Sequence, residues 1–311
     1  MIKPPSPIFT FFGIEGGATC SCLNNGQLLV GSQNGMVQAF GLESKIMEHI
    51  VYVDEEERRI QSIEISGNDT FVYIRSYAVL QLRKPEMSKS TWKVIRTIEV
   101  DHVGFCNFLI LQSQLLFAST DDKRYAKLCW TEIKDESIPT KSNRILDEAD
   151  VNPMCMLVGE EKENEVLIGM EDGRLAICYG DNGMFECQAK QKLGRDPIFC
   201  IASSSKWVAA GCARAPIYLL NRYDLSKQEI PYPPDAAGCS AISFSPNSKQ
   251  IIAGFWDGSI RVFSRHRLNV LLALTNAHSS TISSIIWLPP EQGEIVIATS
   301  SDSTVSLWKL K

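Results

Sequence analysis

The chain lacks an excess of positive charge and lacks any long apolar run. Its 311 residues carry a formal net charge of −5, so it has no general attraction for phosphate backbones or anionic lipid, and neither nucleic acid nor membrane is expected as a partner. No stretch of 18 apolar residues occurs, and residues 1–7 lack the apolar core of a signal peptide. We therefore expect a soluble, intracellular protein.

Motifs that mark common enzyme sites are also missing. The sequence contains no Gly-X-X-X-X-Gly-Lys phosphate loop, no Gly-X-Gly-X-X-Gly, no His-Glu-X-X-His and no Gly-X-Ser-X-Gly. These absences favour a protein that is not an enzyme, and we expect no catalytic residue and no bound cofactor.

Cysteine and histidine do not form a recognisable metal pattern. The ten cysteines include no Cys-X-X-Cys, and the one close pair, Cys20 and Cys22, has no cluster of histidines to complete a zinc site. Most cysteines fall at apolar, strand-like positions, such as Cys129, Cys178 and Cys200, which predicts buried free thiols in a reducing compartment. The four histidines are spread along the chain: His49, His102, His266 and His278. No metal site is expected.

A long repeat dominates what is present. The run from Ala253 to Phe263 reads Ala-Gly-Phe-Trp-Asp-Gly-Ser-Ile-Arg-Val-Phe, and weaker copies recur at intervals of 41–49 residues. The clearest copies, at residues 31–40, 169–179 and 299–308, each have a small residue, a turn with Asp, Asn or Gly, and an alternating strand that ends in a large apolar residue. The closing residues are Phe40, Leu82, Trp130, Tyr179, Leu220, Phe263 and Trp308. Repeats of roughly 40–45 residues with four short strands are typical of propeller blades, so the sequence predicts an all-β, seven-bladed propeller.

Local patterns support strands rather than helices. Residues 260–263 and 305–308 alternate with period two, and Asp257-Gly258 supplies the positive φ of a tight hairpin turn. The second and fifth copies are degenerate, because their turns, residues 75–77 and 212–216, lack the Asp-Gly signal. Their spacing and their flanking β-rich runs still identify them as blades.

We expect one domain over residues 1–311. The approximate repeats are 14–45, 46–95, 96–135, 136–185, 186–225, 226–265 and 266–311, and residues 1–13 complete the last blade. Residues 8–12 are strand-like and precede the first complete copy, whereas the last copy lacks its outer strand. An N-terminal strand that fills this place would close the ring and remove an open sheet edge.

Two charged segments interrupt the blades. Residues 54–59 read Asp-Glu-Glu-Glu-Arg-Arg, and residues 134–150 join the third and fourth copies. Each is interpreted as a solvated loop, although the acidic run could also meet a basic partner surface.

Trp256 lies in the hairpin turn immediately before Asp257. Aromatic residues are over-represented among binding hot spots, so Trp256 is a candidate contact for a partner; the alternative is packing against an adjacent blade.

The seven copies together resemble a WD-repeat protein over essentially the full chain, on a divergent branch in which few copies keep the closing Trp-Asp. In WD-repeat blades a His, a Ser or Thr, the turn Asp and the closing Trp form a buried hydrogen-bond tetrad. The resemblance implies that His278 bonds to Asp302, with Ser300 and Trp308 completing the network. A catalytic Ser/His/Asp triad is the competing interpretation of the same residues, and the structural one is favoured.

More narrowly, the chain resembles the guanine-nucleotide-binding-protein β-subunit-like protein 1 family, whose fungal relatives are called ASTRA-associated protein 1. Val103-Gly104-Phe105-Cys106 and Pro153-Met154-Cys155 discriminate best, because they are not general WD-repeat features. Further segments carry the resemblance: residues 4–7, 31–35, 171–173, 254–257 and 260–263, and the end just after Leu307-Trp308.

The likeness to true G-protein β subunits extends only to the fold. Those subunits carry an N-terminal helix that coils with a γ subunit, whereas Pro4, Pro5 and Pro7 forbid a helix here. We expect no G-protein γ subunit as a partner.

The narrower resemblance implies a scaffold or adaptor that acts with the co-chaperone complex for newly made phosphatidylinositol-3-kinase-related protein kinases, in cytoplasm and nucleus. It also implies a monomeric propeller within a complex, whose binding face carries inter-blade loops and turns that include Glu171, Trp256 and Ser301. Two alternatives are a substrate receptor of a ubiquitin ligase or a chromatin-complex subunit, and, more distantly, a hydrolase that uses His278 and Asp302.

Overall fold

The computed structural model describes residues 5–84, 92–100, 104–134, 139–159, 164–181 and 183–310. Within these ranges the regular structure consists of β-strands and one short 3-10 helix, η1 (Pro290–Gln292). Pro4, His102 and Val103 of the sequence motifs lie outside the described residues.

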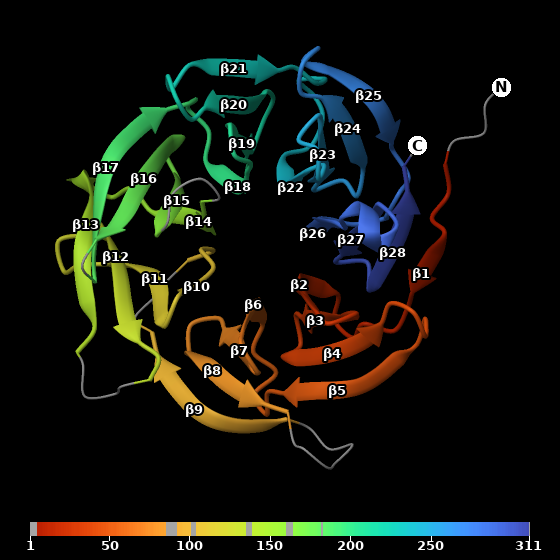
Figure 1. Cartoon of the computed structure of the whole chain (residues 1–311), viewed down its shortest axis with the longest axis horizontal. Helices are drawn as coiled ribbons and strands as arrows, with labels where there is room; N and C mark the ends of the chain where they lie inside the picture. Colours follow the sequence, from red (N-terminus) through yellow and green to blue (C-terminus); the bar gives the residue numbers. More distant parts are fainter. Residues whose placement is uncertain are drawn as a thin grey trace. The chain divides into compact units, whose positions relative to one another are not determined.

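The strands form seven four-stranded sheets, shown in Figure 1. Neighbouring strands pair antiparallel, and the seven closing residues of the sequence repeat all lie on the third strand of a sheet. The prediction of an all-β, seven-bladed propeller is confirmed.

The first three sheets in chain order contain these strands: β2 (Ala18–Asn24), β3 (Gln27–Ser32), β4 (Met36–Gly41) and β5 (Met47–Val53); β6 (Ile60–Ser66), β7 (Asp69–Ile74), β8 (Ala78–Arg83) and β9 (Lys93–Glu99); β10 (Leu109–Leu111), β11 (Gln114–Thr120), β12 (Tyr125–Glu132) and β13 (Lys141–Ala149).

The fourth, fifth and sixth sheets contain these strands: β14 (Pro153–Val158), β15 (Glu165–Met170), β16 (Arg174–Asp181) and β17 (Met184–Lys192); β18 (Ile198–Ser203), β19 (Trp207–Cys212), β20 (Ile217–Asn221) and β21 (Lys227–Ile230); β22 (Cys239–Phe244), β23 (Gln250–Phe255), β24 (Ile260–Ser264) and β25 (Asn269–Leu274). The seventh sheet contains β26 (Ile282–Trp287), β27 (Ile295–Ser300), β28 (Thr304–Lys309) and β1 (Phe9–Phe11).

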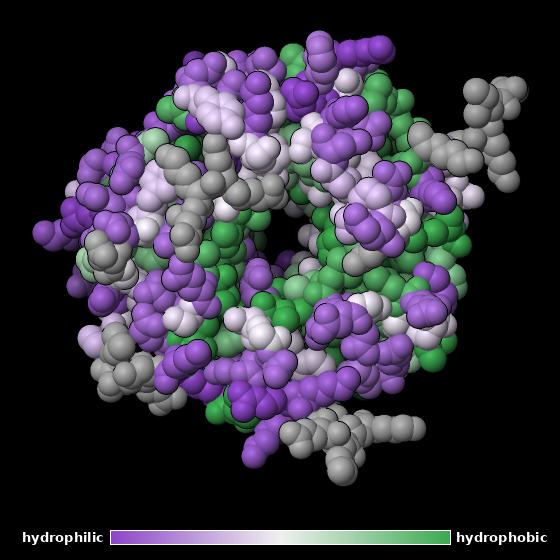
Figure 2. Space-filling model, in the orientation of Figure 1, coloured by the Kyte–Doolittle hydropathy of each residue, from purple (hydrophilic) through white to green (hydrophobic). Residues whose placement is uncertain are grey.

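The chain divides into two compact units. The first comprises Met1–Val100, Gly254–Arg261 and Ala273–Lys311, and the second comprises Asp101–Ala253 and Val262–Leu272. Each unit has its own apolar clusters, built from strand positions that alternate between the two faces of a sheet. Figure 2 shows hydrophilic residues over much of the surface in view, with hydrophobic residues exposed between them, as is usual for a folded protein.

The N-terminal strand completes the seventh sheet. In the register of β1 and β28, Phe9 lies opposite Leu307 and Phe11 lies opposite Val305. Phe11 is 3% exposed and belongs to a buried cluster that includes Phe40. The closure predicted from the incomplete last repeat is therefore confirmed, and β1 adds apolar burial as well as backbone hydrogen bonds.

Glycine is required at the turn before β24. Gly258 has φ +79°, and a Cβ there would lie 2.4 Å from the carbonyl oxygen of His278. The backbone of His278 is also hydrogen-bonded to this turn, because its N–H donates to the Gly258 carbonyl oxygen at 3.1 Å. A side chain at this position would separate the turn from the loop that precedes β26.

Part of the second charged segment is not a loop. Residues 141–149 form β13, the outer strand of the third sheet, which pairs with β12. Ile145 and Leu146 are fully buried, whereas most of their charged neighbours face solvent. Burial is confined to these two residues in the middle of the strand, so the charged residues on either side reach solvent, and the resulting charge content is why composition alone favours a loop here. Residues 135–138 lie outside the described residues.

The first charged segment is a connection between β5 and β6, but its first residue is not solvated. Asp54 is 2% exposed and accepts two side-chain hydrogen bonds from Arg58, at 2.8 and 3.0 Å. Burial opposes ionisation of Asp54, but these bonds, together with one from the Arg58 N–H, outweigh it and hold its pKa below the usual value.

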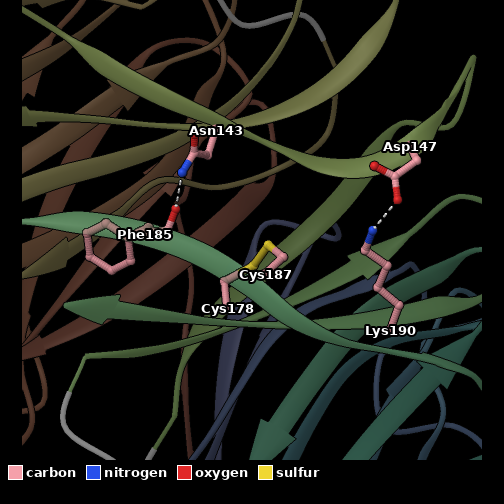
Figure 3. Close-up of a disulfide and its surroundings, with 6 residues drawn as sticks. All are labelled: Asn143, Asp147, Cys178, Phe185, Cys187 and Lys190. Atoms are coloured by element: carbon pink, nitrogen blue, oxygen red, sulfur yellow. Dashed lines mark hydrogen bonds and ion pairs between the residues drawn. A yellow bond between two sulfur atoms is a disulfide. The ribbon is translucent and has the colours of Figure 1, made fainter.

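The cysteine prediction is wrong at one position. Cys178 is bonded to Cys187 in a disulfide that joins β16 to β17, whereas Cys129 and Cys200 are buried free thiols as expected. Figure 3 shows the surroundings, in which Asn143 donates to the carbonyl oxygen of Phe185 and Lys190 pairs with Asp147. The two cysteines lie opposite each other only because of the β16–β17 register, which the sequence does not display.

Deleting residues 1–12 should destabilise the protein, because it removes β1 and the buried Phe11 side chain. Loss of a buried Phe alone costs about 3–5 kcal/mol, so the urea midpoint of unfolding should fall clearly. Deleting residues 1–7 is the matched control, since it leaves β1 intact and should leave the midpoint almost unchanged. Coincident midpoints for the longer deletion and the full chain would contradict the closure.

Candidate functional site

A buried hydrogen-bond network lies within the seventh sheet and the loop before it. His278 precedes β26, Asp302 lies in the turn between β27 and β28, and Ser306 and Trp308 lie on β28. His278 Nδ1 lies 3.0 Å from Asp302 Oδ2, and His278 Nε2 lies 2.6 Å from Ser306 Oγ. Trp308 Nε1 lies 2.6 Å from the same Ser306 Oγ. The network therefore runs from the turn carboxylate to the closing tryptophan.

The donors and acceptors fit a neutral His278. Its Nδ1–H donates to the Asp302 carboxylate, and its Nε2 accepts from the Ser306 hydroxyl, which in turn accepts from the Trp308 indole N–H. Burial lowers the pKa of His278, although the nearby Asp302 opposes this shift. Each polar group in this series of hydrogen bonds, from Trp308 to Asp302, therefore has a partner without a charge on the imidazole.

Asp302 is the most heavily hydrogen-bonded member. Burial alone would raise the pKa of its carboxyl group, but hydrogen bonds from Thr304, from the Ser279 N–H and from His278 lower it below the usual value. The same carboxylate also accepts from the Thr304 N–H at 3.1 Å, which fixes the turn before β28. Asp302 thus joins the turn to the loop that carries His278.

Ser300 does not take the place that the family resemblance implied for it. The hydroxyl between His278 and Trp308 belongs to Ser306, whereas Ser300 Oγ donates to Ser280 O and accepts from the Asp302 N–H. Sequence reasoning missed Ser306, although one signal was available. Ser306 and Trp308 are two residues apart on a strand, so their side chains lie on the same face.

The connectivity of Ser306, His278 and Asp302 is that of a hydrolase triad, but its setting differs. Ser306 is 1% exposed, and its Oγ already accepts from Trp308. A nucleophile must reach a substrate carbonyl, with donors placed for the oxyanion. The hydroxyl here is buried and hydrogen-bonded to both His278 and Trp308, so it has neither the access nor the free lone pair that a nucleophile needs.

A second geometric feature recurs at the turns between the second and third strands. The N–H of the first turn residue donates to the carbonyl oxygen of the residue before the innermost strand, at 2.8–3.0 Å. The pairs are Gln33 with Gly17, Arg75 with Arg59, Glu171 with Asn152, and Ser301 with Thr281. In the sixth sheet the corresponding turn begins with Trp256. We call these turn residues, their acceptors and Trp256 the turn rim.

Trp256 is 40% exposed in this turn, directly after the fully buried Phe255. Its carbonyl oxygen accepts from Thr281 Oγ1 at 3.1 Å, and the Thr281 carbonyl oxygen accepts from the Ser301 N–H at 2.9 Å. Ser301 is exposed and its hydroxyl lies 3.4 Å from Ala18 O. Within the first unit, Trp256 and Ser301 are therefore held next to each other through Thr281.

Glu171, the third candidate contact, belongs to the second unit and is described by itself. It is exposed at the start of the turn between β15 and β16. Its Oε2 accepts from Asn152 Nδ2 at 2.8 Å and from the Asn152 N–H at 3.3 Å. Its carboxylate is therefore oriented by a rim neighbour and remains accessible.

The described residues contain neither a metal centre nor a membrane-spanning helix. Among them no group of three His, Cys, Asp or Glu side chains could hold a metal ion. In the same part of the chain no helix has the length and apolar character needed to cross a membrane.

Replacing Ser306 by Ala should destabilise the protein by about 2–4 kcal/mol, because it leaves the buried Trp308 N–H and His278 Nε2 without partners. Ser279→Ala is the matched control, since Ser279 is exposed and contributes its backbone N–H to Asp302; its effect should stay within about 0.5 kcal/mol. Urea unfolding followed by tryptophan fluorescence measures both. Equal midpoints would show that the network contributes little.

The contribution of His278 to stability should fall as pH is lowered below about 6.5. The pKa of folded His278 lies below its unfolded value, so between these two values the unfolded state binds more protons, and acid favours unfolding. The difference in unfolding free energy between the wild type and His278→Gln should therefore shrink as pH falls from 7 to 5. Glu64, whose pKa burial raises to about 7, has the opposite pH dependence but is present in both proteins and cancels. A difference independent of pH would contradict a neutral buried imidazole.

Comparison with known proteins bears on the part of the chain that carries this geometry. The WD domain, G-beta repeat family matches residues 232–264 and 269–309. The chain is 37% identical over 54 residues to a probable cytosolic iron-sulfur protein assembly protein 1 of Aspergillus terreus, which covers 17% of this chain and 13% of that protein. It is 26% identical over 153 residues to an uncharacterized WD repeat-containing protein of Schizosaccharomyces pombe, covering 48% and 25%. The matched segments thus span a quarter or less of the length of these relatives. Together with the seven four-stranded sheets, the matches identify the chain as a WD40-repeat β-propeller protein.

Proposed function

We propose that this propeller is a non-enzymatic scaffold, a single domain over residues 1–311, that binds partner proteins through its turn rim. WD40 propellers are generally protein-interaction scaffolds. The observation that carries the proposal is the exposure of Trp256 at a rigid turn whose backbone is tied to Thr281 and, through it, to Ser301. A large aromatic side chain held in this way loses little conformational entropy on binding.

The partners we propose are kinases of the phosphatidylinositol-3-kinase-related class and their co-chaperones, in cytoplasm and nucleus, with the propeller as a monomeric subunit of the complex. The support is the resemblance to the guanine-nucleotide-binding-protein β-subunit-like protein 1 family. Two segments that carry it reach the surface: Phe105 is 55% exposed, and Trp256 lies on the turn rim.

A G-protein γ subunit is not among the proposed partners. Pro5, Pro7 and Ile8 are not helical, and β1 begins at Phe9. The described residues before β1 therefore do not form a helix that could enter a coiled coil. The Ile8 N–H instead donates to the carbonyl oxygen of Leu307.

The hydrolase alternative is disfavoured by the setting of its residues. His278 and Asp302 are engaged with Ser306, Thr304 and Trp308 within the blade. A ubiquitin-ligase receptor, a chromatin-complex subunit or an iron–sulfur assembly factor, as the Aspergillus relative is named, would use the same kind of surface with other partners. Affinity purification with mass spectrometry separates these possibilities, because the proposed kinases and co-chaperones should co-purify only under the first.

Trp256→Ala should weaken capture of the co-purifying partners while leaving the thermal midpoint nearly unchanged. Loss of a hot-spot aromatic costs about 2 kcal/mol or more of binding free energy, so recovery of partners relative to bait should fall by an order of magnitude. Tyr223→Ala is the control, since Tyr223 is 68% exposed on the second unit and no role is proposed for it. A large drop in midpoint with full partner recovery would instead make Trp256 a packing residue.

A further inference from the structure

The first unit carries a concave surface away from the turn rim. Consecutive antiparallel strands are joined alternately at the two ends of a sheet, so the β2–β3, β4–β5, β6–β7 and β26–β27 connections lie at the ends opposite the turn rim. Residues of these connections line a groove of about 1820 Å³, which belongs entirely to the first unit. We call it the hairpin groove; its walls are chiefly residues 24–27, 41–45, 67–70 and 83–84, and Glu291.

The size of the hairpin groove points to a peptide rather than a small ligand. Pockets for small molecules usually enclose about 300–1,000 Å³, which is less than this groove offers. It also spans three sheets, since Glu291 comes from the seventh sheet, Glu48 from the first and Asn68 from the second. An extended segment of chain has the length to contact all three.

The turns of the groove present amide groups that the fold does not use. Asn24, Asn25 and Asn68 lie at the β2–β3 and β6–β7 turns, and none of their side chains has a hydrogen-bond partner among the described residues. Asn25 and Asn68 are exposed, so their amides are accessible. A side-chain amide both donates and accepts hydrogen bonds, which matches the N–H and C=O groups of an extended peptide backbone.

A buried hydroxyl in the same lining is also unpaired. Thr70 on β7 is 1% exposed, and its side chain has no hydrogen-bond partner in the part of the chain that the structure describes. A buried polar group that makes no hydrogen bond is costly. Because Thr70 follows Asn68 and Asp69 along the wall of the groove, a ligand seated there can supply the missing hydrogen bond.

Most cations of the hairpin groove are engaged within the protein. Arg83 donates to both carboxylate oxygens of Asp69, at 2.7 and 2.8 Å. The Lys45 ammonium lies 5.7 Å from the ring centre of Phe9, a distance at which the cation is attracted to the ring. Lys84 is exposed and forms no ion pair with any described residue. One lysine of the groove therefore remains unpaired.

Three exposed carboxylates of the groove lack a cation within ion-pair distance among the described residues. They belong to Glu43, Glu48 and Glu291. Glu48 is held by neutral donors, namely Gln27 Nε2 and Ser44 Oγ, the latter at 2.9 Å. These hydrogen bonds lower the pKa of Glu48, and the more distant charges of His49 and Lys84 lower it further. The unpaired charge in the groove is therefore predominantly negative.

We propose that the hairpin groove binds an extended, basic peptide segment of a partner protein. Arginine or lysine side chains of this segment pair with Glu43, Glu48 and Glu291, and its backbone contacts the free amides. The formal net charge of −5 also favours a basic segment over an acidic one. This inference rests on the proposed function and adds a second surface to it. A partner in the groove need not displace one at Trp256, because the two surfaces lie at opposite strand ends.

The test uses the full chain and three fluorescein-labelled peptides of equal length: an Arg-Ser-Gly repeat, its citrulline counterpart, which lacks the charge, and its Glu-Ser-Gly counterpart. Fluorescence anisotropy should show that the arginine peptide binds most tightly and that added salt weakens it. Replacing Glu43, Glu48 and Glu291 together by Gln should weaken this binding about tenfold, because each exposed ion pair contributes a factor of roughly two to five.

A matched triple variant separates the groove from the general charge of the protein. Replacing Glu15, Glu99 and Glu186 together by Gln removes the same charge from exposed positions outside the groove, and binding should stay nearly unchanged. Asn68→Ala and Thr70→Val test the neutral contacts. Each should weaken binding about threefold, the effect of losing one neutral hydrogen bond. The thermal midpoint should stay nearly unchanged in both, because neither side chain has a partner to lose within the described residues.

Several outcomes would overturn the inference. Equal binding of the arginine and citrulline peptides would do so, as would equal losses in the two triple variants. Self-association of the full chain that the groove variant abolishes would assign the groove to a second copy of this chain. Partner recovery in the Trp256→Ala purification separates the two proposals: if recovery falls there but the arginine peptide does not bind, the scaffold function stands and the hairpin groove fails.

Discussion

One backbone hydrogen bond organises the surface on which the functional interpretation depends. It runs from the first turn residue between the second and third strands to the carbonyl before the innermost strand, and it recurs in four sheets with different side chains. Because the bond uses only main-chain atoms, it fixes the position of a turn residue without specifying its identity. Glu171, Ser301 and Arg75 can therefore differ in chemistry while occupying the same geometric place.

The buried network of the seventh sheet complements this bond. Asp302 connects the turn to the loop of His278 by a hydrogen bond, and Ser306 is hydrogen-bonded to both His278 and Trp308. Its members are satisfied side chains inside a sheet, so the network rigidifies the turn beside Trp256 and Thr281. In the second sheet no such acidic residue occupies the turn, since Ser76 stands there.

The sequence predicts the fold better than it predicts individual contacts. A repeat of near-constant length determines the number of sheets, and an incomplete last copy points to β1 as its missing strand. Contacts between side chains depend on register, which the repeat does not reveal. For this reason the family resemblance places Ser300 where Ser306 lies, and the Cys178–Cys187 disulfide is missed. The strand β13 is predicted as a loop for another reason, namely its high charge content. The candidate contact Trp256 is recognisable because a tryptophan in a tight turn is conspicuous without any structure.

The pairing of β1 with β28 also has a consequence for the order of synthesis. Phe9 and Phe11 leave the ribosome early, but Leu307 and Val305, which face them in the sheet, are made almost three hundred residues later. Until then the aromatic strand has no edge on which to pair, and exposed strands of this kind promote aggregation in incomplete chains. The pairing of β1 with β28 must therefore follow synthesis of the C-terminal strands, and until then the apolar strand β1 stays unpaired.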